Sequence, residues 1–334
     1  MRVLVTGGLG YLGSHTCIDL LDSGHDILVI DSLVNSSIER LKNITKISGK
    51  EIKFERTDIR HISPLIDVFQ GFKPEFVIHF AGLKSVSESL NSPIDYYETN
   101  VAGTMNILKA MNVCNCKKII FSSSATVYGN PEYNPCDEEH PTNPINPYGR
   151  TKLIAENLIS DWVVSEEGAK ALIYRYFNPV EAHISGLIGE SPIGNPNNLM
   201  PIILDVATGM NDTLSIFGDD YPTRDGTGVR DYIHVSDLSM AHAAGVEKLN
   251  SLSPYTVVNL GTGKNYSIYE VINIFEKATG HKVNNAVAPR RNGDLAEVWA
   301  SNEKAKNLLK IKFNRSLSEM CADAMRWKQN QIKY

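Results

Sequence analysis

Short apolar runs alternate with amphipathic stretches through the first half of the 334-residue chain. These runs are rich in Val and Ile and apolar throughout, which is typical of parallel strands covered on both faces. They predict six strands: Arg2–Thr6, Asp26–Ile30, Glu51–Glu55, Phe76–Phe80, Lys118–Ser122 and Ala171–Tyr176. The alternation of strands with helix-length segments predicts an α/β fold of the Rossmann type. Its doubly wound parallel sheet would bind ligands at the carboxyl ends of the strands.

The second half of the chain is less regular. Residues 178–232 are rich in Asn, Pro, Gly and Asp, and hold only short periodic segments such as Asn198–Met210. Beyond them the pattern predicts a helix over Val235–Leu249, a strand over Thr256–Leu260 and a helix over Ile268–Ala278. We therefore expect a first domain over residues 1–176 and a smaller mixed α/β lobe over residues 177–334. Elements near residues 235–260 would return to the first domain.

Two helix starts are readable from the sequence. Ser63-Pro64 and Ser92-Pro93 each place a capping residue before a proline. Proline suits the first helical position, and serine suits the position before it. Both pairs therefore predict helix N-termini.

Composition and charge narrow the class of protein. Hydrophobic residues make up 42% of the chain and charged residues 21%, as is typical of a globular protein with a sizeable core. The formal net charge is −5 and the sequence pI about 6.0, which disfavours nucleic acid and anionic membranes as partners. An anionic substrate would need locally placed arginines. The N-terminus MRVLVTGG suggests neither a signal peptide nor a spanning helix. Five cysteines fit no disulfide framework and no zinc spacing, so we expect a cytoplasmic protein without a metal site.

A glycine-rich loop follows the first predicted strand. Gly7, Gly10 and Gly13 form a G-x-x-G-x-x-G pattern that opens a helix. Such glycines permit a tight turn and let the backbone approach a pyrophosphate at the helix N-terminus. Asp31 ends the second strand, 18 residues past Gly13, where a carboxylate can bind the ribose hydroxyls of a dinucleotide. Its charge repels a 2′-phosphate, which favours NAD over NADP, and Arg40 is too far along the chain to reverse this preference.

The third and fourth strands are followed by further candidate contacts. Thr57-Asp58-Ile59 is placed for the adenine ring, and His79-Phe80-Ala81-Gly82 for the middle of the cofactor. His79 itself is expected to be a buried strand residue with satisfied hydrogen bonds, since that is the commoner role of a histidine in such a run.

A catalytic constellation is predicted from the fifth strand and the helix after it. Ser124 closes the strand, and Tyr148 and Lys152 follow in a Y-x-x-x-K pattern. This spacing puts phenol and ammonium on one helix face, so the lysine and a positive nicotinamide ring could lower the phenol pKa. The phenolate would act as general base toward a sugar hydroxyl, with Ser124 hydrogen-bonded to the same oxygen.

The sequence resembles the extended short-chain dehydrogenase/reductase superfamily, and within it the UDP-galactose 4-epimerase family. Matching stretches run in order through almost the whole chain. They are VTGGLGYLGSHT, IHFAGLKSVSES, FSSSATVYG, NPYGRTK, RYFNPV, PNNLMP, IFGDDYPTRDGTGVRDYIHV, VNLGTG and APRRNGDLAEVWA. The resemblance implies that the first domain binds NAD and that the lobe binds a UDP-sugar.

The resemblance also implies the residues of each site. Those expected at the cofactor are Gly7, Gly10, Tyr11, Leu12, Gly13, Asp31, Asn35, Asp58, Ile59, Phe80, Ala81, Lys84, Asn100, Ser122, Tyr148, Lys152 and Phe177. Those expected at the UDP-sugar are Lys84, Ser124, Tyr148, Asn178, Asn198, Leu199, Phe217, Arg230, Tyr232, Arg291, Asp294 and Val298. Arg230 and Arg291 are the local cations that a diphosphate requires in an acidic protein.

The residues beside Ser124 bear on the reaction. Related dehydratases and decarboxylases carry acidic residues there, whereas this chain has Ala125 and Thr126, which cannot protonate a leaving hydroxyl. We therefore expect oxidation and re-reduction at C4 of the sugar, through a 4-keto intermediate that turns over in its pocket. NAD would be regenerated in each turnover and act as a bound prosthetic group.

Two positions depart from the family pattern. A large tyrosine at position 298 accompanies plain hexoses, and a small residue accompanies N-acetylated sugars as well. Val298 therefore predicts acceptance of both UDP-Glc/Gal and UDP-GlcNAc/GalNAc, unless neighbouring side chains refill the space. Glu181 replaces a usual glycine, and would strain the turn if that glycine requires a positive φ.

Two other functions remain open from sequence. A UDP-uronate 4-epimerase would need hydroxyls or a cation for the C6 carboxylate. A non-catalytic NAD-sensing regulator would not need the intact Ser124, Tyr148 and Lys152. The family resemblance also implies a homodimer formed through the helices near residues 93–113 and 146–166.

Overall fold

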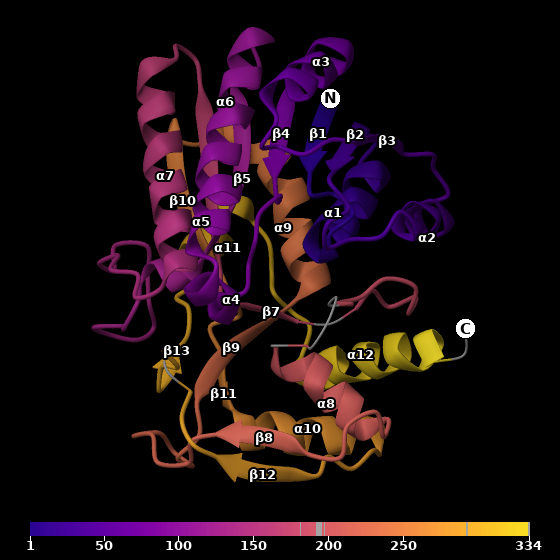
Figure 1. Ribbon diagram of the computed structural model, residues 1–334, viewed down its shortest axis with the longest axis vertical. Coiled ribbons are helices and arrows are strands. Elements are labelled where there is room, and N and C mark those ends of the chain that lie inside the picture. The colour runs from indigo at the N-terminus through magenta and orange to yellow at the C-terminus, as the bar shows by residue number, and fades with distance from the viewer. Residues whose placement is uncertain (181, 192–195, 197, 292, 333–334) are drawn as a thin grey trace.

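A parallel sheet organises the first half of the protein. The computed structural model describes residues 1–180, 182–191, 196, 198–291 and 293–332. Seven parallel strands lie in the order β10-β6-β5-β4-β1-β2-β3 (Figure 1), which confirms the predicted Rossmann-type sheet. They are β1 (Arg2–Thr6), β2 (Asp26–Asp31), β3 (Lys53–Arg56), β4 (Phe76–His79), β5 (Lys118–Ser124), β6 (Lys170–Tyr176) and β10 (Tyr255–Leu260). The strand order reverses between β1 and β4, so the ligand crevice of this fold lies there.

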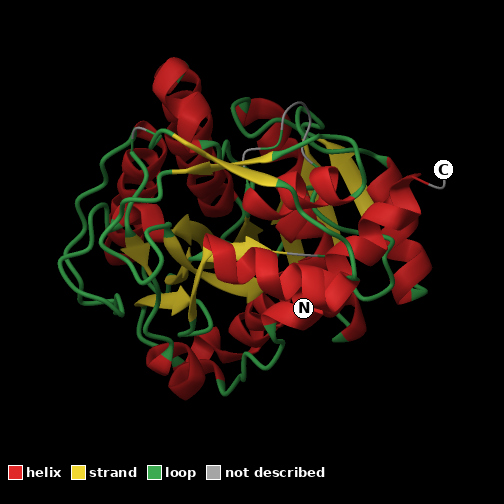
Figure 2. Cartoon of the chain, turned by 90° about the horizontal axis from the view of Figure 1, so that it is seen from below, coloured by secondary structure: helices red, strands yellow, loops and turns green. Residues whose placement is uncertain are grey.

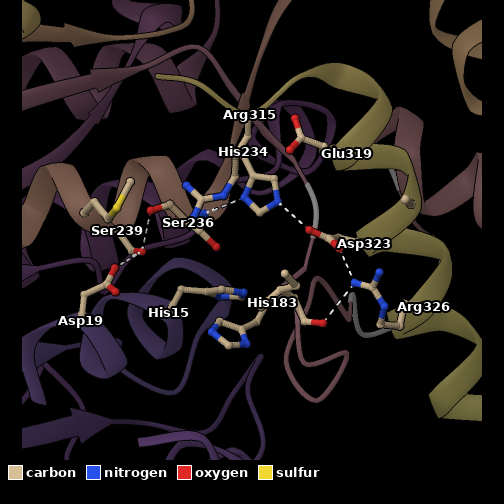
Figure 3. Close-up of a pocket in the computed structure, with 13 residues that line it drawn as sticks. His15, Asp19, His183, His234, Ser236, Ser239, Arg315, Glu319, Asp323 and Arg326 are labelled. Atoms are coloured by element: carbon tan, nitrogen blue, oxygen red, sulfur yellow. Dashed lines mark hydrogen bonds and ion pairs between the residues drawn. The ribbon is translucent and has the colours of Figure 1, made fainter. Parts of the chain in front are cut away.

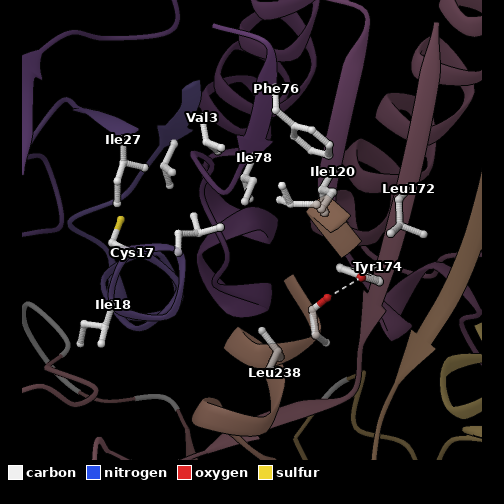
Figure 4. Close-up of a cluster of buried hydrophobic side chains, with 14 of the residues drawn as sticks. Val3, Cys17, Ile18, Ile27, Phe76, Ile78, Ile120, Leu172, Tyr174 and Leu238 are labelled. Atoms are coloured by element: carbon white, nitrogen blue, oxygen red, sulfur yellow. Dashed lines mark hydrogen bonds between the residues drawn. The ribbon is translucent and has the colours of Figure 1, made fainter. Parts of the chain in front are cut away.

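Helices cover both faces of the sheet (Figures 1 and 2). One face packs on α1 (Tyr11–Asp22), α2 (Glu39–Ser48), α9 (Val235–Lys248) and α11 (Glu303–Leu309). The other packs on α3 (Ile62–Phe72), α6 (Gly103–Val113) and α7 (Pro147–Ser165). Figure 4 shows the first core, where strand residues such as Ile78 and Leu172 lie against Cys17 of α1 and Leu238 of α9. Burial on both faces explains why the strands read as continuous apolar runs.

The lobe has its own small sheets and core. β7 (Asn178–Val180), β11 (Asn265–Ser267) and β13 (Glu297–Val298) all pair with β9 (Val229–His234), and β8 (Leu214–Phe217) pairs with β12 (Asn285–Ala288). Apolar side chains of α8 (Leu199–Ala207), α10 (Ile268–Thr279) and α12 (Leu317–Ile332) form the third core. Among the described residues, no helix combines the length and apolar character needed to cross a membrane.

Two elements from the second half join the first domain. β10 pairs with β6 along its whole length, from Tyr255 opposite Ala171 to Leu260 opposite Tyr176. α9 packs beside α1, with Leu238 and Ala241 in the core of that face. The chain therefore passes from sheet to lobe and back before its C-terminal helix.

Of the two predicted helix starts, the one at Ser92-Pro93 is confirmed and the one at Ser63-Pro64 is wrong. α3 begins at Ile62 with His61 in the capping position, so the prediction that Ser63 caps this helix is wrong. Ser92 does occupy the capping position of α5 (Pro93–Tyr96), but its side chain makes no capping hydrogen bond. Each serine-proline pair thus lies at the start of a helix. Pro93 is the first residue of α5, whereas Pro64 is the third residue of α3. Between α5 and α6, residues Tyr97–Ala102 form a π-helix.

A buried ion pair holds β6 against α7. Arg175 of β6 donates to both carboxylate oxygens of Glu156, at 2.7 and 3.1 Å, and both side chains are almost fully buried. Ser123 of β5 donates to the same carboxylate. Because an unpaired charge at this depth is costly, the pair keeps the helix aligned with the ends of both strands.

Candidate active site

The glycine loop leaves no room for side chains at the N-terminus of α1. Gly7 has a φ of +65°, and a Cβ on it would lie 2.7 Å from the Ala81 backbone nitrogen. A Cβ on Gly13 would lie 2.4 Å from the Gly7 carbonyl oxygen. Gly10 occupies the capping position without a side-chain hydrogen bond. The first turn of α1, which begins with Tyr11, thus presents backbone N–H groups for an anionic group at the strand switch point.

Asp31 lies at the carboxyl end of β2, against this loop. Its Oδ2 accepts the Leu9 amide at 3.0 Å, while Oδ1 accepts the Leu33 amide at 2.9 Å and the Ser36 hydroxyl at 2.7 Å. Oδ2, which accepts a single bond, keeps lone-pair capacity for a ribose hydroxyl. Asn35 is exposed in the same turn. The structure therefore brings Asp31 and the glycine loop together, as the spacing predicts.

Arg40 is closer to the loop than its place in the sequence suggests. It donates to the Ser14 hydroxyl of α1 at 3.3 Å and to the Gly189 carbonyl oxygen at 3.2 Å. Burial lowers its pKa, and interactions with Tyr11, Asp31 and Glu190 partly oppose this shift. The fold of α2 therefore returns Arg40 to α1, whereas the predicted preference for NAD stands.

His79 is a structural residue, as predicted. Its ring nitrogens bond the hydroxyls of Thr6 at 2.7 Å and Thr104 at 3.0 Å, and burial lowers its pKa to about 3. The next residue, Phe80, packs its ring on His242, with centroids 4.8 Å apart. The histidine thus remains neutral and fixes β4 to α6.

Asn100 ties the loop after β4 to α7. Its Oδ1 accepts the Leu83 amide at 2.8 Å, and its Nδ2 donates to the Leu83 carbonyl and the Thr151 hydroxyl, both at 3.0 Å. It is buried in the π-helix, a geometry that often marks functional positions. Asn100 therefore aligns the predicted cofactor contacts after β4 with the helix that carries Tyr148 and Lys152.

The predicted adenine contacts follow β3. Arg60 bonds both carboxylate oxygens of Asp58 and lowers the pKa of that carboxyl. Ile59 is buried beneath α6, where a Cβ on Gly103 would lie 2.5 Å from its side chain. This apolar floor suits the flat face of a base.

Ser124, Tyr148 and Lys152 meet at the carboxyl edge of the sheet. Ser124 is the last residue of β5, and all three side chains are buried. Asn146 caps α7 by accepting the Gly149 amide at 2.8 Å, which orients the first turn that holds Tyr148. Lys152 Nζ donates to the Ser122 carbonyl at 2.7 Å and lies 6.0 Å from the centroid of the Tyr148 ring. The predicted catalytic residues are thus brought together.

Burial dominates the electrostatics of this group. It raises the pKa of the Tyr148 phenol to about 12, opposed by a hydrogen bond with Ser124. It lowers the pKa of the Lys152 ammonium to about 8, opposed by the carboxylate of Glu156. The expected lowering of the phenol pKa is therefore not produced by the protein groups alone, and requires a further positive charge.

Thr126 is a partner of Ser124 that sequence reasoning missed. Its hydroxyl and its amide both donate to Ser124 Oγ, at 3.0 and 3.2 Å. Because Ser124 accepts both bonds, its own proton is left to donate to another oxygen. The role follows from the turn over Ala125–Val127, whose first position Ser124 caps.

The lobe contributes two arginines. Arg230 of β9 donates to the carbonyl oxygens of Val229 at 2.8 Å and Ala296 at 3.5 Å, and burial lowers its pKa. Arg291 is paired with Asp294 at 2.9 Å, and its guanidinium lies 4.7 Å from the centroid of the Phe217 ring. The two cations influence each other electrostatically, so they form one region suited to a diphosphate.

Further predicted substrate residues lie on β7, on β13 and at the start of α8. Asn178 begins β7 and pairs with Tyr232 of β9. Val298 of β13 pairs with Arg230 and is buried beside Phe177 in an apolar cluster. Asn198 precedes Leu199, the first residue of α8. Glu181 lies outside the described residues.

Glu190 was not predicted. Its Oε1 accepts from Lys84 Nζ at 2.7 Å and from Asn198 Nδ2 at 2.8 Å. No sequence motif signals this contact, because 106 residues separate Glu190 from Lys84.

A separate cavity of about 330 Å³ lies between α1, α9 and α12 (Figure 3). Its lining includes His15, His183 and His234, together with charged residues of α12. None of its lining residues is a predicted site residue. Among the described residues, no cluster of His, Cys, Asp and Glu is arranged to hold a metal ion.

Comparison with known proteins gives consistent matches over the whole chain. A family model described as GDP-mannose 4,6 dehydratase matches residues 4–324. The UDP-glucose 4-epimerase of Bacillus subtilis (strain 168) is 48% identical over 332 residues, with 99% of this chain and 98% of that protein covered.

Two solved structures are similar in fold as well as sequence. The UDP-glucose-4-epimerase from Stenotrophomonas maltophila, crystallised with NAD and formylated UDP-arabinopyranose, gives a TM-score of 0.97 at 43% identity, covering 100% of this chain and 99% of that one. The UDP-Glc/GlcNAc 4-epimerase from Campylobacter jejuni gives 0.85 at 34% identity, covering 98% and 99%.

The parallel sheet, glycine loop, and Ser, Tyr and Lys at the sheet edge define an extended short-chain dehydrogenase/reductase. Within this superfamily the chain belongs to the family that the model matches and, by its identity with them, to the UDP-glucose 4-epimerases. The chain is therefore an enzyme, an isomerase acting on carbohydrates, as the sequence predicts.

The raised phenol pKa leads to a titration prediction. Without NAD, Tyr148 should hold its proton to higher pH than an ordinary phenol, and should give no phenolate absorbance below about pH 10. The positive nicotinamide ring should move the transition to lower pH. The ultraviolet difference between wild type and Tyr148→Phe, titrated with and without NAD, measures both. A neutral-pH phenolate signal in NAD-free protein would contradict the burial argument.

Proposed function

We propose that this enzyme binds NAD and interconverts UDP-glucose and UDP-galactose through a 4-keto sugar. The observation that carries the proposal is the meeting of Ser124, Tyr148 and the buried ammonium of Lys152 at the carboxyl edge of the sheet. The glycine loop and Asp31 lie at the same edge. The residues proposed to bind the nucleotide and those proposed to react with the sugar thus lie along one crevice.

The residues present fit NAD. A Cβ on Gly7 or Gly13 would clash with the backbone of Ala81 or Gly7, so only glycine permits the tight turn that presents backbone N–H groups to a pyrophosphate. The Asp31 carboxylate, at the adjacent end of β2, can accept from a ribose hydroxyl. When bound, NAD would supply the hydride acceptor and donor for the chemistry at C4 of the sugar. Relatives crystallised with NAD support this cofactor.

The protein groups move the proton. The Tyr148 phenolate, which the charge of Lys152 stabilises, takes the proton of the C4 hydroxyl and becomes a neutral phenol. Ser124, whose Oγ already accepts two bonds from Thr126, donates its proton to the same sugar oxygen. Because Thr126 is committed to Ser124 and Ala125 has no acid, no group here protonates a leaving hydroxyl, which favours epimerisation over dehydration.

The UDP group is held by the lobe. Arg230 is partly buried, and the guanidinium of Arg291 lies 4.7 Å from the centroid of the Phe217 ring, so both cations are available to an anionic group in the lobe. A diphosphate would exchange the weak carbonyl contacts of Arg230 for charge-assisted hydrogen bonds. Firm binding of UDP would leave the sugar free to turn between its two hydride positions.

Replacement of Tyr148 by Phe tests the proposal. Removing the phenol oxygen should reduce kcat at least about a hundredfold, because proton transfer is lost, while NAD and UDP still bind. A coupled assay that converts UDP-galactose to UDP-glucose measures turnover, and equilibrium dialysis measures both ligands.

Tyr174→Phe is the matched control, since Tyr174 is also buried and donates only to the Ala241 carbonyl. It should retain turnover. Wild-type protein inactive on UDP-galactose but active on UDP-glucuronate would instead favour a uronate 4-epimerase.

We propose further that the enzyme accepts UDP-GlcNAc and UDP-GalNAc. Val298 is smaller than tyrosine, pairs with Arg230 in the β13–β9 register and belongs to the same apolar cluster as Phe177. A relative named as a UDP-Glc/GlcNAc 4-epimerase supports the idea. Against it, Val298 is buried among apolar neighbours that could fill part of the space.

Val298→Tyr should reduce kcat/KM for UDP-GalNAc at least about tenfold while UDP-galactose turnover changes little, since only the acetamido group needs the space. Val298→Ala is the control for a small residue, and should keep both activities. Equal losses on both substrates in the tyrosine variant would indicate overpacking rather than a gate.

We also propose a homodimer formed through α5–α7. These helices carry four exposed apolar side chains, those of Ile94, Met105, Ile154 and Val164. A surface patch of such side chains is unusual for a monomer. Sedimentation velocity should show a dimer that Ile94→Asp weakens. The same change at exposed Val287 in the lobe should leave it intact.

A further inference from the structure

We infer that Glu190 is a positioning residue that couples the cofactor side of the site to its substrate side. A single oxygen, Oε1, accepts from Lys84 Nζ at 2.7 Å and from Asn198 Nδ2 at 2.8 Å. Lys84 lies in the loop after β4, and Asn198 precedes α8 of the lobe. One carboxylate therefore holds the ammonium expected at the cofactor and sugar together with the amide expected at the UDP-sugar. This inference rests on the proposed function.

The backbone of Glu190 is held by the C-terminal helix. Trp327 donates to the Glu190 carbonyl at 3.2 Å, and a Cβ on Gly189 would lie 2.6 Å from the Trp327 ring. Upstream, Arg326 donates to the Ile184 carbonyl at 3.0 Å (Figure 3). α12 thus contacts residues 184–190 at Ile184, Gly189 and Glu190. Other side chains of α12 pack in the core of the lobe.

The same segment is tied to the sheet domain. Arg40 donates to the Gly189 carbonyl at 3.2 Å and to the Ser14 hydroxyl at 3.3 Å, and Asn43 donates to the Leu187 carbonyl at 3.1 Å. Residues 184–190 are therefore held from both halves of the protein. The backbone that carries Glu190 cannot shift without breaking hydrogen bonds to α2 or α12.

The solvent exposure of Glu190 and Lys84 indicates which of the two side chains positions the other. The Glu190 side chain is 10% exposed and that of Lys84 is 58% exposed. An exposed lysine samples many rotamers unless a fixed partner selects one, whereas the shielded carboxylate is already in place. Glu190 thus sets the position of the Lys84 ammonium. The same oxygen, Oε1, also orients the Asn198 amide.

Variants of Glu190 separate positioning from general stability. Glu190→Ala removes both contacts, so KM for UDP-galactose and the rate of NAD loss should each rise about tenfold, with kcat at saturating ligands within about twofold. Glu190→Gln keeps an acceptor oxygen for Asn198 but loses the charge facing Lys84. It should restore KM to near wild type while NAD loss stays fast.

Glu166 provides a matched control, because it also holds a lysine and an asparagine, accepting Lys117 Nζ at 2.6 Å and Asn112 Nδ2 at 2.9 Å. Glu166→Ala should leave KM and NAD retention unchanged. In a Lys84→Met background, Glu190→Ala should no longer speed NAD loss.

Several results would overturn the inference. Wild-type KM and NAD retention in Glu190→Ala would do so, as would a loss of kcat alone or equal effects of Glu166→Ala. Failure of the wild-type enzyme to turn over UDP-galactose would instead refute the proposed function. Thermal unfolding of each variant confirms that the protein measured is folded.

Discussion

The site depends on burying one ammonium group at the end of an apolar sheet. Lys152 of α7 is almost fully removed from water, and its ammonium is held at 2.7 Å by the carbonyl of Ser122 in β5. A buried charge costs several kcal/mol unless it has fixed partners, so this contact binds the helix to the strand. Ser124 ends the same strand, and Tyr148 begins the same helix. The geometry between the two reactive hydroxyls therefore follows from where the lysine must lie.

The sheet and the lobe are joined directly next to this group of residues. β6 ends at Tyr176 and β7 begins at Asn178, so Phe177 alone separates the nucleotide-binding sheet from the lobe. The buried pair of Arg175 and Glu156 anchors the strand just before this junction. Residues on the two sides of the crevice are thereby kept in register, although the lobe has a separate core.

The sequence predicted the sheet well because its strands are buried on both faces, and continuous apolar runs have few other structures. It also predicted that Ser124, Tyr148 and Lys152 come together, since strand ends and Y-x-x-x-K spacing are local features. Prediction failed where the decisive contact is not signalled by the local pattern. Ser63 is a plausible cap by that pattern, yet α3 begins at Ile62, and the His61 carbonyl accepts the Leu65 amide at 3.4 Å. The contact of Glu190 with Lys84 and that of Arg40 with Gly189 cannot be predicted from sequence spacing. In each, a residue of the loop around 189–190 meets a residue more than 100 positions earlier in the chain.

The shortness of β13 has an evolutionary consequence. The strand has two residues, with Glu297 opposite Val229 and Val298 opposite Arg230, and Asn265 donates to Glu297 at 2.9 Å on the neighbouring position. Side chains alternate between the faces of a strand, so a slip of one residue exchanges them. A codon gained or lost before this strand would therefore place the Glu297 carboxylate where Val298 now packs in the apolar cluster with Phe177. A change in loop length can thus alter the chemistry of this cluster without any substitution in β13.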